Sequence, residues 1–139
     1  MEKKISHLEI IQGVVNRLSQ NSFLLKGWSV ILVSALFALA ASNTRISFIC
    51  LAYFPVLAFW ILDGYFLWQE SLYRKLYDYV RNLEEEEIDF SMDTSIVKNK
   101  VETWRNVVFS KTLAIFHGTL FCSIFIVMLI MIFLCKGGT

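Results

Sequence analysis

Apolar residues are concentrated in three blocks of the 139-residue chain, at residues 23–41, 46–68 and 112–135. Lys26 is the only charged residue of the first block and Asp63 the only one of the second, while the third has no Lys, Arg, Asp or Glu. About 20 apolar residues in a helix cross a bilayer core about 30 Å thick. The pattern therefore predicts three transmembrane helices, with the ammonium group of Lys26 extending to the membrane interface.

The segments outside the blocks are amphipathic. Apolar positions recur every three or four residues over 5–25, which predicts an amphipathic helix before the first span. We expect this helix to pack on the protein's own cytoplasmic helices, and a helix lying on the membrane surface is the alternative.

The pattern of residues 69–111 predicts a small cytoplasmic helical stalk. This stalk has the form of a hairpin with an acidic turn. The second span continues as a helix beyond residue 69, and four consecutive glutamates, 84–87, form the turn. Asp93 or Thr94 is then expected to cap a second helix that leads directly into the third span.

Lysine and arginine are distributed unevenly among the loops. The segment up to Lys26 holds four and residues 69–111 hold seven, whereas the loop after the first block and the tail after the third hold one each. Basic residues favour the cytoplasmic side of a membrane. We therefore expect the N-terminus and residues 69–111 in the cytoplasm, and the C-terminus on the outer side.

Composition supports this interpretation. The chain is 56% hydrophobic and 18% charged, against about 45–50% and about 25% in soluble proteins. The length is that of one domain, so residues 1–139 are expected to form a single all-α membrane domain with the lipid bilayer as its partner. The net charge of +1 argues against a nucleic-acid-binding protein, which needs a basic face.

Asp63 and His117 are the candidate functional residues, because an ionisable side chain inside a membrane span is energetically costly. Each lies five residues from the cytoplasmic end of its block, which corresponds to a depth of roughly 8 Å. At equal depth on neighbouring helices they are close enough to form a hydrogen bond. The pair is expected either to set the register of the helices or to serve as a polar gate or proton-responsive pair.

Other residues are expected to organise the spans. Small side chains that allow close helix packing in lipid are Gly27, Ser34, Ala38, Ala114 and Gly118. Tryptophans suited to the membrane interface are Trp28, Trp68 and Trp104. Cys50 and Cys135 both lie toward the outer side, and whether they form a disulfide is left open.

No pattern typical of an enzyme is present. The sequence lacks a nucleophile–base pair, a phosphate-binding glycine loop and a metal-ligand spacing. We therefore predict no enzymatic activity, no cofactor and no metal site.

Three stretches resemble a family of small bacterial multi-span membrane proteins of largely unassigned function. They are 21–41 (NSFLLKGWSVILVSALFALAA), 59–73 (FWILDGYFLWQESLY) and 88–94 (IDFSMDT). The resemblance implies a helical fold in the bacterial inner (cytoplasmic) membrane and supplies no catalytic residues. Proteins that look like this often occur beside prokaryotic defence genes, which implies a membrane-disrupting role in defence against phage.

Two functions of different classes follow. The first is a homo-oligomeric channel or membrane-perturbing effector, because three spans alone cannot enclose an aqueous path. The second is a membrane anchor or adaptor whose cytoplasmic helices recruit a soluble protein.

Overall fold

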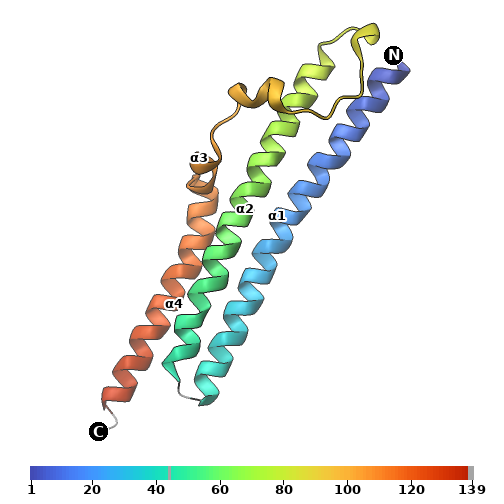
Figure 1. Ribbon diagram of the computed structural model, residues 1–139. Helices are drawn as coiled ribbons and strands as arrows, with labels where there is room; N and C mark the ends of the chain where they lie inside the picture. The colour runs from blue at the N-terminus through green and yellow to red at the C-terminus, as the bar shows by residue number, and fades with distance from the viewer. Residues whose placement is uncertain (44, 138–139) are drawn as a thin grey trace.

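The computed structural model describes residues 1–43 and 45–137, and these contain helices and connecting loops but no strand. The long helices are α1 (Glu2–Asn43), α2 (Ile46–Arg81) and α4 (Lys111–Gly137), and α3 (Trp104–Val108) is a short one. Two 3₁₀ turns, η1 (Glu85–Glu87) and η2 (Ser95–Lys100), lie between α2 and α3. In Figure 1, α1 and α2 form a long antiparallel pair, and α4 lies along the other side of α2.

Helix α1 is continuous, so residues 5–25 and the first apolar block are two parts of one helix. Its buried positions recur at steps of four or seven residues along one face, which is the repeat of a helix packed against a neighbour. They are His7, Ile11, Val15, Ser22, Ser29, Val33 and Ala40. This face packs inside the protein rather than on a membrane surface.

Two apolar cores hold the helices together. The first core joins the N-terminal half of α1, the end of α2 and the following loop: Ile11, Val15, Leu76, Val80, Ile88 and Val97. The second core joins the other half of α1 to α2 and α4: Val33, Ala40, Ile49, Ala52, Val56 and Ile124. The buried polar residues Ser22, Asp63 and His117 lie between the two cores along the helices.

The helices α1, α2 and α4 are each long and apolar enough to cross a membrane. Large apolar side chains also cover their outer surfaces, as shown by Phe23 (77% exposed), Ile115 (70%) and Phe133 (78%). Exposed apolar surface of this extent is unfavourable in water and favourable in lipid. Length and surface therefore both fit helices that are surrounded by lipid.

The return segment from α2 to α4 differs from the continuous helix expected after Asp93. After Asp93 it contains only the six-residue turn η2 and the five-residue helix α3, separated by extended residues. Local hydrogen bonds compete with helix formation here, because Asp89 accepts from the amide of Ser91 and Asp93 from the amide of Ser95. The hairpin thus has one helical arm, formed by α2, and one irregular arm.

The acidic turn closes the open end of the α1–α2 pair. The Oε1 atom of Glu85 accepts a hydrogen bond from the amide of Lys3 at 2.9 Å, which satisfies a free N–H at the start of α1. A hydrogen bond from the Met1 ammonium group, followed by the Lys3 amide, lowers the pKa of Glu85. Phe90, three residues after this turn, has a positive φ of 57°.

Candidate functional site

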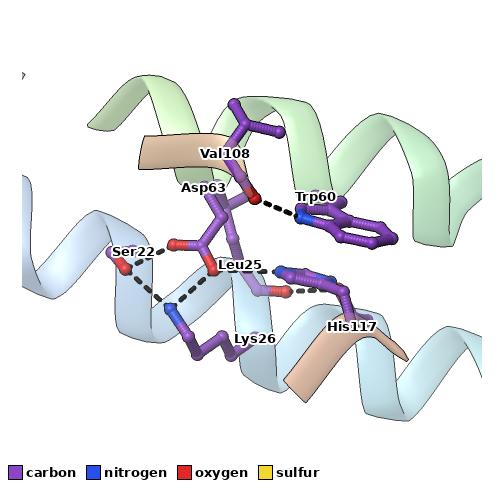
Figure 2. Close-up of polar contacts among 8 residues, drawn as sticks. Ser22, Leu25, Lys26, Trp60, Asp63, Val108 and His117 are labelled. Atoms are coloured by element: carbon purple, nitrogen blue, oxygen red, sulfur yellow. Dashed lines mark hydrogen bonds and ion pairs between the residues drawn. The ribbon is translucent and has the colours of Figure 1, made fainter. Parts of the chain in front are cut away.

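A polar junction of four side chains connects the three long helices. It consists of Ser22 and Lys26 on α1, Asp63 on α2 and His117 on α4 (Figure 2). Ser22 and Lys26 are four residues apart, so they lie on the same face of α1. Each helix brings its polar group to the same level of the bundle.

The carboxylate of Asp63 is the centre of the polar junction. Its Oδ2 atom lies 2.6 Å from Nζ of Lys26 and 3.0 Å from Nε2 of His117. Its Oδ1 atom accepts a short hydrogen bond from Oγ of Ser22. The Lys26 ammonium also donates to Oγ of Ser22 at 2.9 Å, so that the lysine, serine and aspartate form a closed ring.

The polar junction is closed off from the surroundings. The side chains of Asp63 and His117 are 0% exposed, and that of Lys26 is 21% exposed. A buried carboxylate is stable only when a cation and hydrogen-bond donors compensate for its lost hydration. Lys26 supplies the compensating charge, while Ser22 and His117 supply further donors.

The ring of His117 has a defined orientation. Its Nε2 atom must carry the hydrogen of the bond to Asp63, because a carboxylate oxygen only accepts. The indole of Trp60 stacks on the imidazole with an interplanar angle of 10° and a centroid distance of 5.7 Å (Figure 2). The Nδ1 atom is buried and makes no hydrogen bond to another described residue.

Trp60 links the polar junction to the segment that precedes α4. Its Nε1 donates a hydrogen bond to the carbonyl oxygen of Val108, the last residue of α3, at 2.8 Å. The close approach of α3 requires a glycine at position 64, since a Cβ atom there would lie 2.4 Å from Cγ2 of Val108. A movement of α3 would therefore be transmitted to His117 through one aromatic side chain.

The structure brings Asp63 and His117 together, as the sequence predicts, at one level of neighbouring helices. Lys26 and Ser22 also belong to the site, although neither was predicted as a member of it. The expectation that Lys26 extends to the interface is wrong, because its ammonium group points to Asp63. A signal was present: Lys26 and Asp63 are the single opposite charges of two adjacent apolar blocks. No feature of the sequence marked Ser22 as a member of the site.

Four of the five predicted small residues make no close contact between helices of this chain. Ser34 and Ala38 are exposed, and a Cβ atom at Gly27 or Gly118 would meet nothing within 4 Å. Ala114 is half-buried on α4. The predicted small residues of α1 do not pack on α2 because their side of the helix faces away from α2. Gly64, which was not predicted, occupies the tight contact.

The predicted interfacial tryptophans lie outside the polar junction. Trp28 is 56% exposed on α1, and Trp104, at the start of α3, is 37% exposed. Trp68 is half-buried on α2 and contacts Tyr65. Among the described residues, Cys50 and Cys122 form no disulfide. The side chain of Cys135, on which the open question of a pair with Cys50 depends, lies outside those residues.

The chemistry available at the site is that of a buried ion pair that is hydrogen-bonded to an imidazole. Among the described residues, no group of three or more His, Cys, Asp or Glu side chains is placed to hold a metal ion. Comparison of the chain with models of protein families, with curated proteins and with solved structures gives no match.

Proposed function

We propose that the chain is a non-enzymatic protein of the bacterial inner membrane. In this proposal it acts as a homo-oligomeric channel or membrane-perturbing effector in defence against phage. Helices α1, α2 and α4 span the bilayer, with the N-terminus and residues 69–111 in the cytoplasm and the C-terminus outside. The observation that carries the proposal is the meeting of one ionisable residue from each span, Lys26, Asp63 and His117, in one buried junction.

The polar junction would hold a resting state. A single chain with three packed spans encloses no aqueous path, and apolar side chains cover its outer surface. Conduction therefore requires several copies and a rearrangement that exposes polar groups to a common axis. A change of charge at one member removes the partner of the others, and this destabilises the contact among all three spans.

The experiment is an ion-flux measurement on proteoliposomes containing wild type, Asp63→Asn or Thr119→Val. The asparagine keeps the size of the side chain but removes the charge that pairs with Lys26. Thr119 is an exposed polar residue of α4 near the same level and outside the polar junction. We expect Asp63→Asn to increase flux, with a more than linear dependence on protein density, and Thr119→Val to behave as wild type. Vesicles that stay tight for every variant at every density would overturn the channel proposal.

The second candidate is a membrane anchor or adaptor, and the shape of the molecule favours it. Helices α1 and α2 both extend beyond their apolar blocks and form an arm whose end carries the acidic tip, residues 84–93 (Figure 1). A soluble partner with a basic surface fits this tip. Pull-down with Glu86→Lys plus Asp89→Lys, both exposed positions, tests the candidate. Loss of a partner without a change in flux would favour the anchor over the channel.

A further inference from the structure

The residues just before α4 present basic and aromatic side chains to the surroundings. This juxtamembrane segment, residues 98–111, contains four basic residues and one acidic residue. Arg105 and Lys111 are exposed, and no ion pair joins either to a carboxylate within 1–43 and 45–137. Trp104 is 37% exposed and Phe109 is 73% exposed.

The fold holds this segment at the end of the apolar part of α2. Val108 is buried against Gly64 and accepts the hydrogen bond from Trp60. The apolar block of α2 ends only four residues further on, at Trp68. In Figure 1, α3 lies beside α2 directly above the start of α4. If the spans are embedded as proposed above, this level lies near the boundary between the acyl chains and the headgroups of the cytoplasmic leaflet.

We propose that the juxtamembrane segment is a binding surface for anionic phospholipid headgroups. Arg105 and Lys111 would contact the phosphate groups, and Trp104 and Phe109 would enter the boundary between headgroups and acyl chains. Because the inner face of α3 is packed on α2, these four side chains are presented without further ordering of the backbone. Lys98 and Lys100 lie further along the arm and add long-range attraction.

The charge distribution along the arm supports an anionic surface rather than a neutral one. The loop at residues 82–94 has six acidic residues and no lysine or arginine. It lies at the far end of the arm in Figure 1, away from α4. The basic residues lie close to the bilayer in this arrangement and the acidic residues lie far from it. An anionic leaflet would therefore attract the juxtamembrane segment, whereas the distant tip is largely screened from it.

The experiment measures lipid retention by the full chain in neutral detergent, using native mass spectrometry with phosphatidylglycerol and phosphatidylcholine as probes. Three proteins are compared: wild type, R105Q/K111Q, and the control K3Q/R81Q, which removes two exposed charges from the distant end of the arm. Each charge near an anionic surface contributes about fivefold to affinity. We expect wild type to prefer phosphatidylglycerol, R105Q/K111Q to lose about 25-fold in that preference, and the control to keep it.

Equal retention of the two lipids by wild type would overturn the proposal, and so would an equal loss in both double variants. Unchanged phosphatidylglycerol retention by R105Q/K111Q would also overturn the proposal. It would favour a soluble protein, rather than lipid, as the partner of this face. The inference rests on membrane insertion, which extraction of cell membranes with alkaline carbonate tests separately. A chain that resists extraction but shows no preference for phosphatidylglycerol contradicts this inference alone, and tight proteoliposomes contradict only the channel.

Discussion

Nε2 of His117 lies 3.0 Å from Oδ2 of Asp63, although the two residues are 54 positions apart in the chain. The same oxygen atom lies 2.6 Å from the ammonium group of Lys26. One carboxylate oxygen therefore connects α2 to both neighbouring helices. The stability of the bundle and the response of the protein to a change of charge should both depend on this atom.

Replacement of Asp63 by alanine should strongly destabilise the bundle. It leaves the Lys26 ammonium group and the buried His117 ring without their partner, and breaking one side of a buried ion pair costs about 3–5 kcal/mol. Unfolding of the protein in mixed micelles, followed by tryptophan fluorescence, measures the loss.

The double variant Lys26→Met plus Asp63→Leu should recover much of that stability, since it removes both charges. If Asp63→Ala alone unfolds at the same detergent ratio as wild type, the polar junction contributes nothing to stability.

Alanine at position 64 should displace α3. Its Cβ atom would lie 2.4 Å from Cγ2 of Val108 and 3.1 Å from the Cα atom, so backbone as well as side chain must move. Overpacking of this kind costs about 1–3 kcal/mol. Gly27→Ala is the matched control because its Cβ atom meets nothing within 4 Å, and alanine favours a helix over glycine by about 1 kcal/mol. Thermal unfolding should show a loss for Gly64→Ala and a small gain for Gly27→Ala; equal melting temperatures would contradict the observed contact.

Trp60→Phe separates the two roles of this side chain. Phenylalanine can still stack on His117 but cannot donate to the carbonyl oxygen of Val108, and a lost hydrogen bond of this type costs about 1 kcal/mol. We expect faster amide exchange at residues 104–110 and little change around residue 117. Equal acceleration in both regions would show that the indole N–H is not what holds α3.

The contact between Glu85 and the start of α1 should weaken in acid. The Met1 ammonium group and the Lys3 amide lower the pKa of this carboxylate below its ordinary value. A depressed pKa in the folded state means that the stabilisation is present above the unfolded value, near 4.5, and is lost as the pH falls through the folded value. Amide exchange of residues 3–8 should therefore accelerate below about pH 4.5, after correction for intrinsic rates. The Glu85→Gln variant should exchange quickly at every pH; if its profile matches wild type, the carboxylate does not hold this end of the helix.

The three long apolar helices could be read from the sequence because each block is long enough by itself to determine its local structure. The shared level of Asp63 and His117 could also be inferred, because rise per residue in a helix is constant. The predicted position of the Lys26 ammonium group was wrong for a physical reason. A lysine near the end of a span can reach either the interface or a buried carboxylate, and only the rotation of α1 about its axis decides between them.

The irregular path between α2 and α4 also could not be predicted from patterns in the sequence. Apolar residues at 97, 101, 104 and 108 have helical spacing, yet local side-chain hydrogen bonds at Asp93 and the docking of Val108 on Gly64 break the helix. Likewise, a stripe of small residues looks the same in sequence whether it faces a neighbouring helix or the surroundings.

The sequence by itself determined that this protein has three helices long and apolar enough to cross a membrane, and that two ionisable residues lie at one level within them. Both follow from local properties, namely hydrophobic length and helical rise. Only the tertiary structure decided that Lys26 and Ser22 complete the polar junction, and that Trp60 and Gly64 connect it to α3. These depend on the rotation and packing of whole helices, which arise from contacts between residues distant in the chain.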